Sequence, residues 1–241
     1  MSWTTVLVVT AVVWLVTLIR SVRWRAFVYS LPLPMTVALV GSNHPVDGTQ
    51  LLGVVGLNLF FLTVTVGYLR LGLPILLADA LGLGVYLVLS AALLRIGPLA
   101  FGPTLVGVLG LWLVVTVWLR RRAGPAPPRP SRQPLPAPLR LLVVLAGSTV
   151  TVLLGEQLRG MVVTFPYSGV LVAIESRHDL AEFSRHFAGN SLGLVGFLAG
   201  YHWLADGTQT LALAGAWTGY ALTAVLIRLP RWWRPRLLPE H

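Results

Sequence analysis

The chain contains no cysteine, and its eighteen basic residues are all arginine, so lysine is absent as well. Without cysteine there is no disulfide, no thiol nucleophile and no thiolate ligand for a metal. Charged residues make up only 11% of the chain, whereas an ordinary soluble domain has about 25%. Hydrophobic residues reach 56%, the mean hydropathy is +0.78, and long runs are almost free of charge. The sequence therefore predicts an all-α, polytopic membrane protein.

Motifs of common enzymes are also missing from the sequence. It has no phosphate-binding glycine loop, no HExxH pair and no nucleophile elbow. The net charge of +10 comes from arginines at the ends of apolar runs, and no tract resembles a nucleic-acid-binding module. We therefore expect no enzyme activity, no cofactor, no metal site and no nucleic-acid partner.

Nine apolar segments have about the length that a membrane span requires. The predicted spans are 3–19, 27–41, 51–69, 72–94, 98–119, 140–155, 160–174, 189–204 and 207–227. A stretch rich in proline and arginine, 120–138, has no apolar run and is typical of a solvated linker. A basic tail, 229–241, follows the last span.

Arginine placement predicts the orientation, because positive charge prefers the cytoplasmic side of a membrane. If the N-terminus is outside, sixteen of the eighteen arginines fall inside, and only Arg95 and Arg159 fall outside. The sequence thus predicts a multi-pass protein of the cytoplasmic (inner) membrane with its C-terminus in the cytoplasm. The lipid bilayer is its expected partner, and a homo-oligomer is left open.

Two parts of the chain repeat one another. Pro34 and Pro166 are 132 positions apart, whereas Gly56 and Gly189, and likewise Gly67-Tyr68 and Gly200-Tyr201, are 133 apart. The first copy (1–95) begins outside and the second (139–228) begins inside, because a linking span within 96–119 returns the chain to the cytoplasm. We therefore predict an inverted repeat of two four-helix units. Such repeats often surround a transport path, although a fused dual-topology dimer would give the same pattern without transport.

The second copy resembles a known family. Phe165-Pro166, the apolar run FPYSGVLVA and a glycine-containing span after a polar turn are similar to the GlpM-like family of small inner-membrane proteins. The resemblance covers about 139–228 and, more weakly, 3–94, where Leu33-Pro34 replaces Phe-Pro. It implies a tandem, duplicated version of that membrane unit and no particular activity.

Candidate substrate-binding residues stand at polar or proline-broken positions of the predicted spans. They are Pro34, Asn58, Asp79, Pro166, Tyr167 and Asn190. Paired proline-interrupted spans are typical of a transporter's binding site, although proline also kinks helices for packing. Asn58 and Asn190 either line the repeat axis or form packing hydrogen bonds. Asp79 is the only carboxylate well inside a long apolar run, which indicates a cavity, a partner or proton coupling unless the residue lies nearer the interface.

The polar segment ESRHDLAEFSRH holds three gating candidates, His178, Glu182 and His186. A helix would place them on one face, with Leu180, Phe183 and Phe187 on a separate apolar stripe. The first and last are about 12 Å apart along a helix, too far for one metal ion. The preferred interpretation is an amphipathic connector at the cytoplasmic interface, and the alternative is a gate or pH-sensitive latch.

These features favour a small permease or secondary carrier with an unknown small-molecule or ion substrate. Its site is expected between the second, third, seventh and eighth spans. The alternative is a non-transporting membrane scaffold or an accessory protein of envelope synthesis. A polar cavity between the repeats would favour the first, and a dry interface would favour the second.

Overall fold

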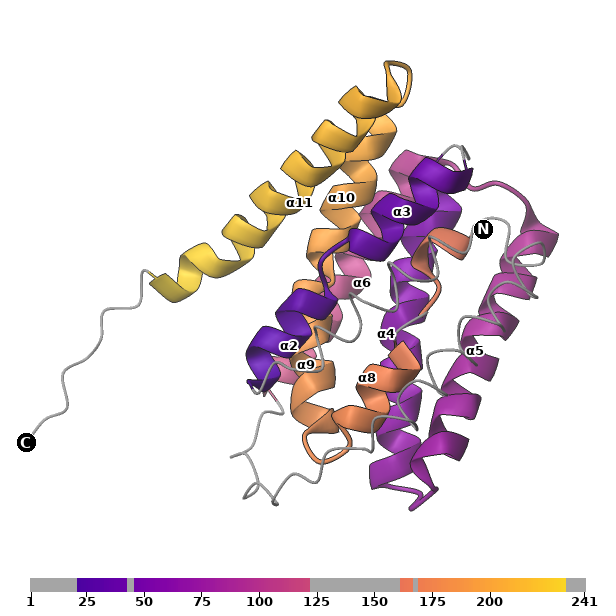
Figure 1. The fold of residues 1–241 in the computed structure, drawn as a ribbon, viewed down its shortest axis with the longest axis vertical. Helices are drawn as coiled ribbons and strands as arrows, with labels where there is room; N and C mark the ends of the chain where they lie inside the picture. The colour runs from indigo at the N-terminus through magenta and orange to yellow at the C-terminus, as the bar shows by residue number, and fades with distance from the viewer. Residues whose placement is uncertain (1–20, 43–45, 122–160, 167–168, 233–241) are drawn as a thin grey trace, which may run out of the picture.

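The computed structural model describes residues 21–42, 46–121, 161–166 and 169–232 (Figure 1). Within these ranges every regular element is a helix and no strand forms. The elements are α2 (Val22–Tyr29), α3 (Leu33–Ser42), α4 (Gly48–Leu69), α5 (Ile75–Ile96), α6 (Phe101–Arg121), η1 (Val162–Thr164), α8 (Gly169–Glu175), α9 (Leu180–Asn190), α10 (Leu192–Trp203) and α11 (Gln209–Trp232). The predicted spans 3–19 and 140–155, and nearly all of the predicted linker and tail, lie outside the described residues.

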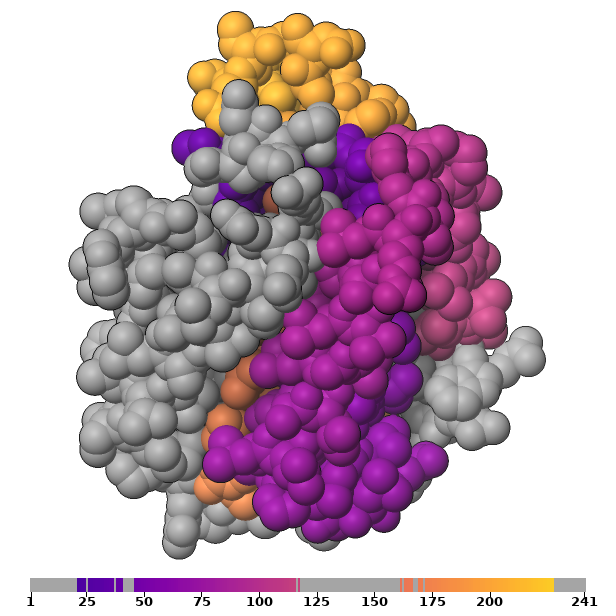
Figure 2. All heavy atoms as spheres, turned by 90° about the vertical axis from the view of Figure 1, so that its right-hand side faces the viewer, coloured from indigo at the N-terminus to yellow at the C-terminus, as the bar shows by residue number. Residues whose placement is uncertain are grey.

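Three described helices are long and apolar enough to cross a membrane, namely Gly48–Leu69, Ile75–Ile96 and Gln209–Ile227. Phe101–Val115 is a shorter apolar helix. Figure 2 views the molecule from the side of α5, whose outward face exposes large apolar residues such as Leu76 and Val88. Such a face suits lipid, because soluble proteins rarely expose continuous apolar patches of this kind. These helices indicate a membrane protein and match the predicted spans 51–69, 72–94 and 207–227.

Two predicted spans are broken helices, as their prolines suggest. The span predicted at 27–41 consists of α2 and α3, which Leu31 and Pro32 separate after Ser30 ends α2. The hydroxyl of Ser30 donates to the carbonyl of Phe27 at 2.7 Å, and that of Thr36 donates to the carbonyl of Pro32 at 2.8 Å. Backbone amides donate to the same two carbonyls, from Ser30 at 3.0 Å and from Thr36 at 2.8 Å, so the hydroxyls add a second hydrogen bond to each carbonyl beside the break.

The span predicted at 160–174 is broken in the same way. It consists of the single turn η1, a connection through Phe165 and Pro166, and the short helix α8. Proline lacks the amide that would continue the helix, which explains the interruption. Neither segment is one continuous helix, and both are interrupted at or beside the prolines that the sequence pairs, Pro34 and Pro166.

The helix α9 is amphipathic as predicted, but its apolar stripe faces the protein. Phe183 and Phe187 are fully buried, and their rings lie 5.2 and 4.8 Å from the ring of Phe61 on α4. Tyr29 of α2 contacts the same rings. The expected connector on a membrane surface is thus corrected: the stripe packs against α2 and α4, where aromatic rings already gather.

Helices α9 and α10 form a nearly continuous rod that runs antiparallel to α4 (Figure 1). Ser191 joins them with helical backbone angles, φ −62° and ψ −18°. Three hydrogen bonds connect the rod to α4 and to Val46, two residues before α4. They join Val46 with His202, Asn58 with Ser191, and Thr65 with Ser184. Residue numbers rise along one partner and fall along the other, so the two directions are opposite.

Two helical hairpins, α4–α5 and α10–α11, are built alike. In the first, an added Cβ on Gly56 would lie 2.9 Å from the ring of Tyr86. In the second, a Cβ on Gly193 would lie 2.8 Å from the ring of Tyr220. Each tyrosine belongs to a buried stripe at every fourth position, formed by Ala78, Gly82, Tyr86 and Ser90 on α5 and by Ala212, Ala216 and Tyr220 on α11. The small residues allow the close helix approach seen in membrane bundles.

Candidate functional site

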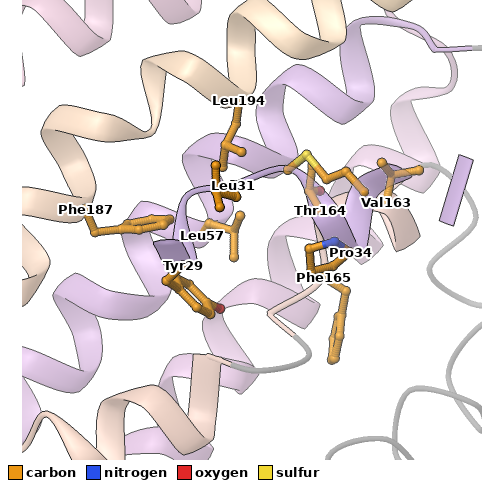
Figure 3. A pocket seen from close by; sticks show the side chains of 10 residues that line it. Tyr29, Leu31, Pro34, Leu57, Val163, Thr164, Phe165, Phe187 and Leu194 are labelled. Carbon is orange, nitrogen blue, oxygen red and sulfur yellow. The ribbon is translucent and has the colours of Figure 1, made fainter. Parts of the chain in front are cut away.

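A small cavity lies where the two proline-broken segments meet (Figure 3). Its volume is about 30 Å³, which is space for about two water molecules. The lining residues come equally from both halves of the chain: Tyr29, Leu31, Pro34, Met35 and Leu57 from the first, and Val163, Thr164, Phe165, Phe187 and Leu194 from the second. The hydroxyls of Tyr29 and Thr164 are the polar side-chain groups of this otherwise apolar lining.

The cavity includes part of the predicted substrate-binding set. Pro34 lines it, and Pro166 is buried directly beside the lining residue Phe165. Leu31 and Val163, which are 132 positions apart like the two prolines, face it from the two breaks. Tyr167 lies outside the described residues. The structure therefore brings together the two proline breaks that the sequence marks as corresponding.

The side chain of Asn58 forms a hydrogen bond between the two halves of the chain. Its Nδ2 donates to the hydroxyl oxygen of Ser191 at 3.1 Å and to the carbonyl of Val54 at 2.9 Å. Ser191 in turn donates to the carbonyl of Ala188 at 2.9 Å. Asn58 thus forms packing hydrogen bonds, one of the two predicted alternatives, and its partner is Ser191 and not the neighbouring Asn190, because a step of one position turns a side chain by about 100° around a helix.

A hydrogen-bonded group beside the cavity is absent from the predicted set. The hydroxyl of Tyr86 lies 3.0 Å from the carbonyl oxygen of Met161 and 2.9 Å from Oγ1 of Thr164. Oγ1 of Thr164 lies 3.2 Å from the same carbonyl. These contacts hold α5 against η1. Tyr86 belongs to a series of small or polar residues spaced four positions apart on the buried face of α5. That spacing is the signal in the sequence that could have identified Tyr86.

Asp79 stands apart from the cavity. Its side chain is 2% exposed, and neither carboxylate oxygen has a hydrogen-bond partner within the part of the chain that the structure describes. The residue lies in the second turn of α5, next to Ala78, which packs against Gly67 of α4. The expectation that Asp79 shares a site with Pro34 is therefore wrong, and the buried carboxyl group forms a second place of interest.

The gating candidates separate as well. Glu182 and His186 are paired on α9, with 3.5 Å between Oε1 and Nε2. His178 precedes Asp179, the N-cap of α9, so it is not on the helical face that its spacing predicts. Among the described residues no group of three or more His, Asp or Glu side chains is arranged to hold a metal ion.

His202 joins three helix ends that no sequence motif had connected. Its Nδ1 lies 2.6 Å from the carbonyl oxygen of Val46, which precedes α4, so this nitrogen carries the hydrogen. The imidazole stacks on the ring of Phe101, the first residue of α6, at a centroid distance of 3.8 Å. The end of α10 is thereby fixed to the starts of α4 and α6.

No family model, no curated protein and no solved structure matches this chain. Its functional interpretation therefore depends on the geometry of its own residues. That geometry combines a water-sized cavity between two proline breaks, polar contacts between antiparallel helices and an isolated buried carboxyl group.

Proposed function

We propose that the protein is an inverted repeat of about nine spans in the cytoplasmic membrane and acts as a small permease or carrier. The observation that carries the proposal is the hydrogen bond between Asn58 and Ser191, whose separation of 133 positions equals the offset of the repeat. Equivalent residues meet side by side only near a two-fold axis. Because α4 and the α9–α10 rod are antiparallel, that axis lies across the helices, in the plane of a membrane that they span.

A second contact continues the same antiparallel register. Thr65 contacts Ser184 at 2.8 Å, and this pair lies seven positions from Asn58 on one helix and seven from Ser191 on the other. The proline breaks at paired positions are further support for a duplication.

The cavity limits the cargo. Sites for organic ligands usually have about 300–1,000 Å³, ten times or more the volume found here. A closed conformation of a carrier, or a cargo no larger than water, fits a cavity of about 30 Å³. Proline breaks on both sides supply places where helix segments can reorient, since a missing amide bond weakens a helix locally.

The aromatic contacts favour a second function, that of a scaffold without transport. Tyr29 lies 5.5 Å from Phe61, and Phe61 lies 4.8 Å from Phe187, measured between ring centroids. Such packing between α2, α4 and α9 is close and apolar. An accessory protein of envelope synthesis, in keeping with the resemblance to small inner-membrane proteins, would need nothing more.

The topology is tested with single cysteines, which the chain naturally lacks. Leu71→Cys places a thiol in the exposed turn between α4 and α5, and Ala205→Cys places one in the exposed turn between α10 and α11. A membrane-impermeant maleimide should label Ala205→Cys in right-side-out vesicles and Leu71→Cys in inverted vesicles. Labelling of both from one side would contradict the inverted repeat.

Transport is tested at the cavity itself. Leu31→Cys and Val163→Cys place thiols in its lining, and Val64→Cys, fully buried elsewhere on α4, is the matched control. A carrier that alternates should expose the cavity cysteines to impermeant reagent from each side in turn, while Val64→Cys stays unlabelled. Cavity cysteines as unreactive as Val64→Cys in both vesicle orientations would favour the scaffold.

A further inference from the structure

The carboxyl group of Asp79 has no structural task that its surroundings reveal. It does not cap α5, because Pro74 is the N-cap and no side-chain cap bond forms. The amides of Leu77 and Ala78 already donate to the carbonyl of Pro74. In the second copy the corresponding position falls at Ala212 or Leu213, both apolar residues that pack in or against the core. An apolar side chain therefore fits this position, and packing does not require an acid.

The charged groups on the neighbouring helices leave Asp79 unpaired. α5 packs mainly on α4 and α8, whose titratable side chains are Tyr68 on α4, Asp47 at its N-cap and Glu175 on α8. None of them forms a hydrogen bond or an ion pair with Asp79. No arginine or histidine of the described residues does so either. Within the part of the chain that the structure describes, the buried carboxylate thus has no compensating positive charge, which is a costly arrangement inside a membrane.

A metal ion does not suit this place. Hard cations take about six or more oxygen ligands, and sites for them combine several carboxylates and carbonyls. Asp79 offers two oxygens of one carboxylate, and the described residues hold no cluster of acidic or histidine side chains around it. A proton, by contrast, needs only one oxygen atom. The chemistry of the isolated carboxyl group thus selects the proton.

We propose that Asp79 is a reversible proton-binding site and that the proton is the cargo or coupling ion of the carrier. The transport part of this inference rests on the proposed function, and the binding part does not. Binding forms one O–H bond on the carboxylate and breaks one in hydronium, so the site changes from −1 to neutral with no redox step.

Polar groups farther along α5 fit proton movement. Tyr86 and Ser90 follow Asp79 by seven and eleven positions, which places each within about 20° of Asp79 around the helix axis, on the same face. Tyr86, Thr164 and the carbonyl of Met161 share two hydroxyl hydrogens among three oxygens. The hydrogens can therefore be arranged in two ways, with either hydroxyl donating to the other. The hydroxyl of Ser90 is buried without a partner in the described part of the chain.

Proton binding is tested by pH-difference infrared spectroscopy on the purified protein in lipid. The wild type should show a carboxylic acid band that appears on acidification and is missing from Asp79→Asn. Asp206→Asn, the same change at an exposed turn, should keep the band. A band that persists unchanged in Asp79→Asn, or its absence from the wild type, overturns the proton site. Proton release on addition of sodium ions would assign the site to that ion and overturn it as well.

Transport is tested separately in proteoliposomes that contain a pH-sensitive dye, with a potassium diffusion potential as the driving force. We expect proton flux that falls at least tenfold in Asp79→Asn and stays unchanged in Asp206→Asn. An infrared band specific to Asp79 without any flux would contradict the proposed carrier and leave the proton site standing. Flux that survives in Asp79→Asn would overturn Asp79 as the coupling group.

Discussion

Asn58 of α4 donates from Nδ2 to the hydroxyl oxygen of Ser191, 3.1 Å away in space and 133 positions later in the chain. In the proposed repeat the two residues are equivalents of one another. Their contact places two similar stretches of sequence side by side, on two antiparallel helices. The proposed function is placed at this junction because both halves contribute equally to the lining of the cavity there.

The first prediction concerns this contact. Asn58→Ala and Ser191→Ala should each lower the free energy of unfolding by about 1 kcal/mol, as is usual for a hydrogen bond between membrane helices. In the double variant the loss should fall short of the sum by about 0.6 kcal/mol, because the contact can be removed only once. Unfolding in mixed micelles measures the free energy of unfolding of the two single variants and the double variant. Asn58→Ala combined with Asn190→Ala is the control and should be additive; additivity for Asn58 and Ser191 would contradict the contact.

The second prediction concerns the helical hairpin α4–α5. A Cβ at Gly56 would lie 2.9 Å from the ring of Tyr86, and that ring cannot move easily because its hydroxyl is hydrogen-bonded to η1. Gly56→Ala should therefore cost about 1–3 kcal/mol of unfolding free energy, the range typical of overpacking. Gly84→Ala, where nothing lies within 4 Å of the added Cβ, should be neutral or stabilising by up to about 1 kcal/mol. Equal effects of the two changes would show that the hairpin is not tightly packed at Gly56.

Long apolar runs were enough to predict the helices that could cross a membrane. α4, α5 and α11 lie where the sequence places them, because length and hydropathy alone decide such spans. The proline breaks were also readable, since proline removes a backbone donor wherever it stands. In both cases the deciding physics is local to the segment.

Contacts between segments could not be predicted in this way. The stripe of Phe183 and Phe187 has helical spacing, which indicates that it is buried but not against which partner. Likewise, the repeat pairs Asn58 with Ser191 or Asn190 depending on one inserted residue, and only packing decides between them. Asp79 appeared to belong with Pro34 because both are unusual in an apolar run, yet its helix directs it elsewhere.

The third prediction distinguishes a packed α9 from a helix on the membrane surface. Phe187 is 1% exposed, and its ring contacts Tyr29 and Phe61. Phe187→Ala should cost about 3–5 kcal/mol of unfolding free energy, as removal of a buried aromatic ring usually does. Arg185→Ala, two residues away and exposed, should change it by no more than about 0.5 kcal/mol. Were α9 an interfacial connector, Phe187→Ala would leave the unfolding transition nearly unchanged.

The fourth prediction concerns the corner where His202 meets Val46 and Phe101. His202→Ala removes the hydrogen bond from Nδ1 and the stacked ring together, and should cost about 1–3 kcal/mol. The amide of Gly48 donates to the carbonyl of Leu99 at the same corner, at 3.0 Å. In His202→Ala this amide should exchange its hydrogen faster than in the wild type. Hydrogen exchange followed by mass spectrometry measures this locally.

The two contributions of His202 can be separated. In His202→Asn the side-chain amide stands near the position of Nδ1 and can still donate to the carbonyl of Val46, but the stacking on Phe101 is lost. Protection of the Gly48 amide should then be intermediate between the wild type and His202→Ala. Trp203→Ala, at the exposed neighbouring position, controls for changes at the end of α10 and should leave that amide protected. If His202→Ala also left it protected, the three helix ends would be held together by backbone contacts such as that of Gly48 with Leu99, and His202 would merely lie over the corner.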